Sequence, residues 1–237
     1  MHNRKFFNSL NKTSGWLWPF NNHATLVNWL ISYYKADTSW SFPDSHWSNN
    51  WVISWASYTA SGKINWAYSF DWLNDYVDLL DNVDLRLLWN YSISFWIKSN
   101  NNSVIQRYIN KDDALDFSWG YALTLAGWQI ILTHNNWVDQ NYWTWFNPPV
   151  WVWTYLTLTF DWSNRKFYVN WIQSWWNIWT SWNMTWDTNK LYIWTFGASV
   201  PQGQYMDWLI DEIWIWDKAL ITSEITDLYN SWNWLSY

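Results

Sequence analysis

The chain has no cysteine, few glycines and prolines, and few basic residues. Without cysteine, its 237 residues can form no disulfide, no thiolate zinc site and no cysteine nucleophile. Only 13 Lys and Arg face 19 Asp and Glu, so there is no basic stripe to follow nucleic-acid phosphates. Polar residues interrupt every apolar run before the roughly 18 residues that a membrane-spanning helix needs. We therefore expect neither nucleic acid as a partner nor insertion into a membrane.

Tryptophan is the residue present in excess. The chain has 31 Trp and 6 Gly, whereas average usage gives about 17 glycines at this length. Asn-Gly and Asp-Gly are the strongest signals for a tight hairpin, and here Trp stands in that place. Nine tryptophans follow Asn or Asp: Trp29, Trp51, Trp66, Trp72, Trp137, Trp162, Trp171, Trp208 and Trp234.

Tryptophan in a left-handed turn is costly. Each such residue costs roughly 1–2 kcal/mol, so ten of them cost about 10 kcal/mol, comparable with the whole stability of a domain. We therefore hypothesise that most of these tryptophans are UGA codons that the source reads as glycine. The alternative is a protein that is truly rich in Trp, with an aromatic surface for carbohydrate. The hypothesis predicts many exposed tryptophans at turns.

The chain divides into three parts. Residues 1–27 are polar and aperiodic, and predict a flexible arm or linker. They start with basic residues but lack the apolar segment of a signal peptide. Residues 28–232 form the expected domain, and residues 233–237 form a short tail. Half of the residues are hydrophobic, which is enough for the core of one all-β domain of this size.

Short strand-like runs recur through the domain with turn signals between them. Tyr91 to Lys98 alternates apolar and polar residues, as a strand with one buried face does. Close spacing of such runs is typical of a β-sandwich. The runs are Leu30–Tyr34, Ala67–Phe70, Tyr76–Leu79, Tyr91–Lys98, Ser103–Tyr108, Tyr121–Leu125, Gln129–Thr133, Tyr155–Phe160, Lys166–Val169, Leu191–Ile193 and Leu209–Trp216.

Two segments depart from the strand pattern. Thr222 is expected to cap a short helix through Glu224, Ile225 and Leu228, with the acidic residue in the first turn. Residues 174–188 are rich in Asn and Trp, and predict a long surface loop.

Several blocks of the chain, in the right order, resemble LamG-like jellyroll domains of the concanavalin A-like lectin/glucanase superfamily. The opening block is Trp29 to Tyr34, similar to a Gly-Leu-Val-x-Tyr-Tyr strand. The most recognisable block is Gly62-Lys63-Ile64-Asn65-Trp66-Ala67-Tyr68-Ser69-Phe70-Asp71-Trp72-Leu73-Asn74-Asp75-Tyr76-Val77. Ser92 to Lys98 matches the next, where the family itself has Trp.

Two later blocks extend this resemblance to about residue 230. Trp153 to Trp162 is similar to Trp-x-His-x-x-x-Thr-Tyr-Asp-Gly, although the histidine is missing. Trp208 to Leu220 resembles Gly-x-Ile-Asp-Glu-Val-x-Ile-Tyr-x-Arg-Ala-Leu. The comparison favours Trp96, Trp153 and Trp216 as true tryptophans and implies an antiparallel two-sheet jellyroll sandwich.

No pattern in the sequence supports catalysis. Glycosidases of this superfamily carry alternate acidic residues on one strand, Glu-x-Asp-x-Glu or a longer form, so that the carboxylates share a cleft. Here Asp211 and Glu212 are adjacent and are expected to point to opposite faces of a strand. A structural role is favoured for Glu212, hydrogen-bonded near the junction of strand and helix. No catalytic residue is expected.

Calcium is the one metal that the sequence allows. Asp71, Asn74 and Asp75 cluster between two strands and offer the oxygen ligands that Ca²⁺ takes. The simpler interpretation is that these side chains cap the turn through local hydrogen bonds. No cofactor is required on either interpretation.

The expected function is non-catalytic binding of a glycan or glycoprotein on the concave sheet face or its rim loops, with Ca²⁺ as an optional aid. Candidate ligand residues are Asn74, Asp75, Tyr142, Phe146, Phe196 and Tyr205. The first alternative is a structural or adhesion module of a phage virion or tail or of a bacterial surface protein, and the second is a glycoside hydrolase. The resemblance implies an extracellular, cell-surface or virion location.

Overall fold

The structure is a computed structural model of the 237-residue chain. It describes residues 26, 28–36, 44–46, 49, 52–80, 82–87, 89–111, 120–135, 139–174, 178–179, 191–193 and 206–230. The expected arm and tail, and most of the loop 174–188, lie outside these residues. Leu26, assigned above to the arm, is buried against the domain.

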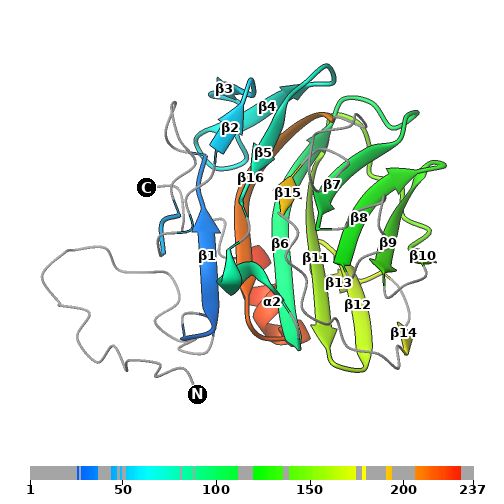
Figure 1. The fold of residues 1–237 in the computed structure, drawn as a ribbon. Coiled ribbons are helices and arrows are strands. Elements are labelled where there is room, and N and C mark those ends of the chain that lie inside the picture. Colours follow the sequence, from blue (N-terminus) through cyan, green and yellow to red (C-terminus); the bar gives the residue numbers. More distant parts are fainter. Residues whose placement is uncertain are drawn as a thin grey trace, which may run out of the picture.

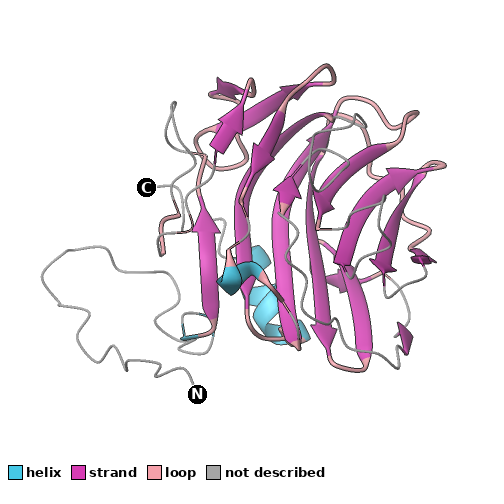
Figure 2. Ribbon diagram, in the orientation of Figure 1, coloured by secondary structure: helices cyan, strands magenta, loops and turns pink. Residues whose placement is uncertain are grey.

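Two antiparallel sheets face each other and form a sandwich (Figures 1 and 2). One sheet has nine strands within the described part of the chain. Along its main path they are β13 (Ile172–Gln173), β12 (Asn164–Val169), β11 (Trp153–Asp161), β6 (Asn90–Ser99), β16 (Asp207–Trp216), β4 (Ala67–Asp71) and β3 (Ser57–Thr59), with β1 (Leu30–Tyr34) paired to β16 and β14 (Ile178–Trp179) to β12.

The other sheet has seven strands among the described residues. They run in the order β10 (Asp139–Trp143), β9 (Gln129–Asn135), β8 (Gly120–Ala126), β7 (Gln106–Asn110), β15 (Tyr192–Ile193), β5 (Tyr76–Asp78) and β2 (Val52–Ser54). The expected antiparallel sandwich is confirmed, and each predicted run contains or overlaps a strand. The sequence patterns missed β2, β3, β10, β13 and β14, which are five residues long or shorter.

The core between the sheets is built from alternate residues of the central strands. In β6, Ile93, Phe95 and Ile97 point into the core, and Leu156 and Leu158 of the paired strand β11 join them. Strands β8 and β9 contribute Leu123, Leu125, Ile130 and Leu132 from the opposite sheet. This alternation is the pattern that the sequence showed at Tyr91 to Lys98.

The opposite face of the nine-stranded sheet is also buried. The helix α2 (Thr222–Asn230) covers it, and Ile225 and Leu228 pack onto an aromatic layer that we call the outer cluster. Its members are Leu26, Leu30, Tyr33, Trp96, Tyr155, Tyr168, Trp214, Trp216, Leu220, Ile225 and Leu228. The Trp216 ring nitrogen donates a hydrogen bond of 3.0 Å to the Leu26 carbonyl. Trp96 and Trp216 thus have packing roles that fit true tryptophans.

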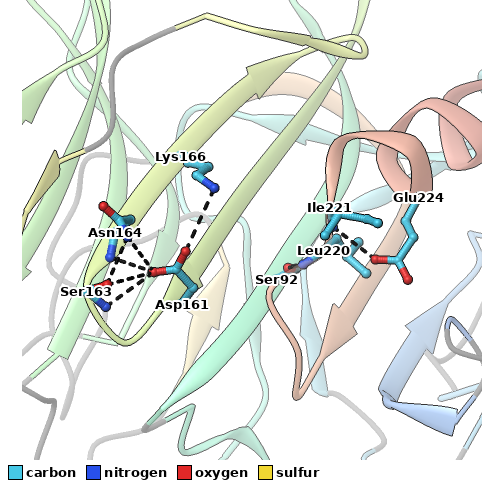
Figure 3. A network of polar contacts seen from close by, with 8 residues as sticks. All are labelled: Ser92, Asp161, Ser163, Asn164, Lys166, Leu220, Ile221 and Glu224. Atoms are coloured by element: carbon cyan, nitrogen blue, oxygen red, sulfur yellow. Dashed lines mark hydrogen bonds and ion pairs between the residues drawn. The ribbon is translucent and has the colours of Figure 1, made fainter.

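The start of α2 differs from the prediction by one residue (Figure 3). Thr222 is the first helical residue, so Ile221 is the N-cap. The Ile221 N–H donates to Glu224 Oε2 at 3.0 Å. This is one of the two hydrogen bonds of a capping box, and it needs no hydroxyl group on the N-cap side chain. Ser92 Oγ ties the preceding segment to β6 by accepting from the Leu220 N–H at 2.8 Å.

The hairpin between β11 and β12 shows how the tight turns are made (Figure 3). Asp161 Oδ1 accepts hydrogen bonds from the backbone N–H of Asn164 at 2.8 Å and from its side-chain amide at 3.0 Å. Between them Trp162 has a φ of 68°. The turn is therefore at the position where the sequence predicted one, and its backbone is left-handed at the tryptophan.

Five further described tryptophans have a left-handed backbone. They are Trp55, Trp72, Trp128, Trp145 and Trp151, with φ between 57° and 73°. The side chains of all six are exposed, and of the tryptophans whose side chains the structure describes, eleven are exposed and four are buried. Trp208 is a correction: it stands at a glycine position of the family, but it is a fully buried core residue with no positive φ.

Replacing Trp216 with Ala is expected to lower the free energy of unfolding by about 3–5 kcal/mol, since it leaves a cavity in the outer cluster. Trp171→Ala is the control, because that side chain is exposed and its loss is expected to cost far less. Chemical denaturation followed by circular dichroism measures both. Equal losses in the two variants would contradict the packing role of Trp216.

Candidate functional site

An open hollow of about 500 Å³ lies at one end of the sandwich. Three loops line it: Asn100–Ser103 after β6, Trp128 in the turn between β8 and β9, and Asn147–Val150 before β11. Its volume falls within the range of small-molecule sites. Four of its nine lining residues are asparagines, whose amides add hydrogen-bonding groups to a lining that is otherwise mostly apolar.

Buried hydrogen bonds hold the first of these loops in place. The Gln106 side chain is fully buried, and it donates to the Asn101 carbonyl at 2.6 Å and accepts from the Asp207 N–H at 3.2 Å. The Asn100 amide donates to Asp207 Oδ1 at 2.7 Å, and the Asn102 amide donates to the Pro148 carbonyl of the facing loop. The shape of the hollow therefore does not depend on a ligand to order these residues.

The turn between β4 and β5 holds three of the predicted site residues. Asp71 Oδ1 accepts from the Leu73 N–H at 2.9 Å, and Asp75 Oδ2 accepts from the Asp71 N–H at 2.8 Å. These are the local capping bonds that the simpler interpretation expects. Asp75 is also buried, which raises the pKa of its carboxyl group to about 6. Asn74 is exposed.

The acidic turn and the hollow belong to the same end of the molecule. Asp71 pairs with Asp207 across the two strands, and Asp207 holds Asn100 at the wall of the hollow. The Trp72 N–H donates to the Met206 carbonyl at 2.8 Å. The structure thus brings the proposed calcium residues near the loops of the hollow, although no three of the His, Asp and Glu residues that it describes gather in a metal-binding arrangement.

The predicted aromatic ligand residues are only partly placed. Tyr142 and Phe146 are half-buried and pack against the core, so they are not a free stacking surface. Phe196 and Tyr205 lie outside the described residues. The sequence analysis missed the asparagines of the hollow. An Asn-rich loop has the same sequence pattern wherever it lies, so the sequence does not show which loops meet at the end of the sandwich.

The outer face of the seven-stranded sheet is closed at its middle strands. Val77, Leu191 and Ile193 point into the core, so their neighbours Asp78 and Tyr192 point away from it. Both of these residues, and Asn110 beside Tyr192, are nevertheless buried. A ligand surface on this sheet face is therefore less accessible at these strands than the rim hollow is.

Asp211 and Glu212 are both buried in hydrogen bonds. Asp211 Oδ2 accepts from the Ile64 N–H at 2.8 Å, and Glu212 accepts from the Tyr33 hydroxyl. The register of β16 shifts between Asp211 and Trp214, and Glu212 has a φ of 51°. A bulge therefore replaces the regular alternation that was expected here. The structural role predicted for Glu212 agrees with its buried bond to Tyr33.

Three exposed tryptophans lie in the loops of the hollow or next to them in sequence. Trp128 lines it, while Trp145 and Trp151 flank the loop Asn147–Val150, and at 63, 78 and 64% exposure they resemble a stacking surface for sugar rings. All three have a positive φ, however. Their backbone conformation is thus one that glycine adopts without strain. Their side chains, in contrast, are suited to stacking on sugar rings.

Residues 71–226, about two thirds of the chain, match the model of the concanavalin A-like lectin/glucanases superfamily. The chain belongs to this superfamily. No curated protein matches its sequence. Within the described residues, no helix is long and apolar enough to cross a membrane.

Solved structures of other proteins share the fold. Domain 4 of AbnA, an extracellular GH43 arabinanase from Geobacillus stearothermophilus solved with arabinotriose, is 21% identical with a TM-score of 0.69, over 84% of this chain and 98% of that domain. The binding domain of Paraclostridial Mosquitocidal Protein 1 is 15% identical, with a TM-score of 0.71 over 87% of this chain. A botulinum neurotoxin type C structure, whose cell entry depends on two gangliosides, is 16% identical, with a TM-score of 0.67 over 88% of this chain. This chain spans about half of each of these two toxin chains.

Proposed function

We propose that the protein is a non-catalytic module that binds a glycan or glycoprotein in the rim hollow. The observation that carries the proposal is the hollow at the end of a lectin-like sandwich, whose loops carry four asparagines and are held by hydrogen bonds. Sugar hydroxyls are donors and acceptors, so amides on a rigid frame can fix their orientation. Asp211 and Glu212 are occupied in buried bonds, which argues against their use as a catalytic pair.

The similar structures support the same class of ligand. One was solved with arabinotriose and another concerns entry through gangliosides, so the fold carries carbohydrate recognition in proteins distant from this one. Fold does not determine function, and the ligand class comes to this chain as a proposal. An extracellular, cell-surface or virion location follows from it, since complex glycans are displayed there.

Calcium is proposed as an aid at the neighbouring turn. The residues present fit a hard cation in part: Asp71 and Asp75 provide carboxylates, and Asn74 provides an amide oxygen. One oxygen of the buried Asp75 carboxyl, Oδ1, has no hydrogen-bond partner. A bound Ca²⁺ would satisfy this oxygen and would favour the ionised form that burial disfavours.

Glycine is proposed as the natural residue at the six left-handed tryptophans. Their combined strain is roughly 6–12 kcal/mol, close to the whole stability of a typical domain of about 5–15 kcal/mol. Four of them, Trp55, Trp128, Trp145 and Trp151, do not follow Asn or Asp, so the backbone identifies positions that the dipeptide pattern missed. Decoding of UGA as glycine explains all six. The glycan site then consists of amides and backbone rather than of indoles.

Two other functions make different predictions. A structural or adhesion module of a phage virion or tail or of a bacterial surface protein would form a symmetric oligomer and bind no sugar. A glycoside hydrolase would release reducing sugar, and its activity would be lost in Glu212→Gln. The order of preference is binding module, structural module and hydrolase.

The binding proposal predicts that a glycan array detects at least one ligand. Asn147→Arg places a long charged side chain in the hollow and is expected to weaken that binding at least tenfold. Ile172→Arg is the matched control, because it adds the same charge to an exposed residue of β13. Full binding by Asn147→Arg, or equal loss in both variants, would contradict the placement of the site.

The calcium proposal predicts a higher melting temperature in millimolar CaCl₂ than in EDTA. Asp75→Asn is expected to abolish this difference, since it removes the buried carboxylate. Asp84→Asn, an exposed carboxylate in the short helix η1 (Val83–Leu85), is expected to keep it. Melting curves that do not respond to calcium would refute the metal site but leave the glycan hollow as proposed.

The glycine proposal predicts that tandem mass spectrometry of the native protein across Tyr155–Val169 finds glycine at position 162. In the chain as printed, Trp162→Gly is expected to be more stable than Trp162→Ala by about 1 kcal/mol, because only glycine lacks the Cβ that strains a positive φ. At Trp89, whose φ is not positive and whose ring stacks on Trp162, the order should reverse. Tryptophan in the native peptide would end the proposal.

A further inference from the structure

The core contains one arginine whose charge nothing described around it neutralises. Arg165 lies on β12 and is 1% exposed. Its neighbours on the same side of β12 and across the sheet are core residues: Phe167 on its own strand, and Phe160 and Tyr91 in register on β11 and β6. The guanidinium therefore points between the two sheets rather than toward solvent.

Aromatic rings surround this guanidinium. Its central carbon lies 4.9 Å from the centroid of Phe160 and 5.6 Å from that of Tyr142, which comes from β10 of the opposite sheet. The Tyr91 ring stacks on Tyr121 at a centroid distance of 5.5 Å and lies tilted against Phe160 at 5.4 Å. Ring faces attract a cation, but they accept none of its hydrogen bonds in the way that an oxygen does.

Within the described part of the chain, the guanidinium nitrogens Nε, Nη1 and Nη2 and the Tyr91 hydroxyl have no partner at hydrogen-bond geometry, although the hydroxyl lies close enough to the guanidinium to favour its charged form. The nearest acidic residue in sequence, Asp161, is engaged instead with its own turn and with Lys166 at 3.9 Å. Arg165 forms no ion pair with any residue that the structure describes. Five N–H donors thus converge on a region that offers them a phenol oxygen and the faces of rings.

The buried guanidinium remains charged at neutral pH. Burial lowers the pKa of Arg165 to about 10, and the nearby Tyr91 opposes this shift. Burial in turn raises the pKa of Tyr91 to about 12, so the phenol stays neutral and supplies no counter-charge. An uncompensated charge inside a protein costs several kcal/mol even after relaxation, so a compensating group is expected.

We propose that Arg165 and Tyr91 form a binding site for a small monovalent anion of the size of chloride, inside the sandwich. The anion accepts from the guanidinium N–H groups and from the Tyr91 hydroxyl, whose donors are all unused. One negative charge balances the single positive charge, which a water molecule does not. A large or divalent anion does not suit a place walled by Phe160, Tyr142 and Tyr121.

The site is separate from the rim hollow. None of its residues lines the hollow, so the anion is a structural ligand and the proposal does not depend on glycan binding. Tyr142, expected from the sequence to contact a glycan, has a different role here: its ring covers the guanidinium.

The test is thermal unfolding of the full chain at constant ionic strength, with sodium chloride replacing sodium gluconate. Gluconate is too large to enter the core. Binding to the folded state is expected to raise the melting temperature by about 3–6 °C for each tenfold increase in chloride above the dissociation constant. Bromide, of similar size and charge, is expected to act like chloride.

Arg165→Met removes the charge and keeps the length of the side chain, so it is expected to abolish the chloride response. In gluconate alone this variant should be at least as stable as the parent, because a hydrophobic residue replaces an unpaired buried charge. Lys166→Met, the next residue on β12, removes an equal but partly exposed charge and is expected to retain the response.

A parent chain that does not respond to chloride, or a response that persists in Arg165→Met, would overturn the proposal. If Arg165→Met does not fold, bromide-soaked crystals of the parent chain decide the question. Anomalous density within hydrogen-bond distance of the Arg165 guanidinium supports the site. Its absence at saturating bromide refutes it.

Discussion

The sandwich depends on tight reversals of the chain at the ends of its strands. Antiparallel neighbours such as β11 and β12, or β8 and β9, are joined by turns in which the backbone is left-handed at one or two residues. Glycine adopts that conformation without strain. The same turns make up part of the rim. The left-handed backbone that the turns require therefore also determines the shape of the loops from which a ligand site is built. A bulky residue in such a turn strains the fold and changes the site together.

Charged and polar groups inside the sandwich separate into satisfied and unsatisfied sets. Glu212 and Gln106 are buried with hydrogen-bond partners and join segments that lie far apart in the sequence. Arg165 and Asp75 are buried with polar atoms that lack partners. Because an unpaired buried polar atom is costly, an anion at Arg165 and a cation at Asp75 would each stabilise the fold.

Much of the fold follows from the sequence, because strand alternation is a local pattern. Tyr91 to Lys98 shows it clearly, and this segment is a central strand with two covered faces. The edge strands β2, β3 and β13 are too short to show a period. The site was harder to predict, because Asn100–Ser103 and Asn147–Val150 are 44 or more residues apart and meet only through the topology. Nor does Arg165 look buried in sequence, since it follows a turn and precedes another basic residue.

The rim allows two kinds of carbohydrate recognition, and backbone geometry favours one. Indole rings at Trp128, Trp145 and Trp151 would bind by stacking, which tolerates many sugars. Amides at Asn100, Asn101 and Asn147 would bind by directed hydrogen bonds, which discriminate among hydroxyl arrangements. Stacking requires tryptophan at three positions with a positive φ, where its side chain strains the turn. The amides require no strain, since Gln106 and Asp207 hold the loop of Asn100 and Asn101, and Asn102 ties it to the facing loop at Pro148. A selective, hydrogen-bonding site is therefore the better match to this frame.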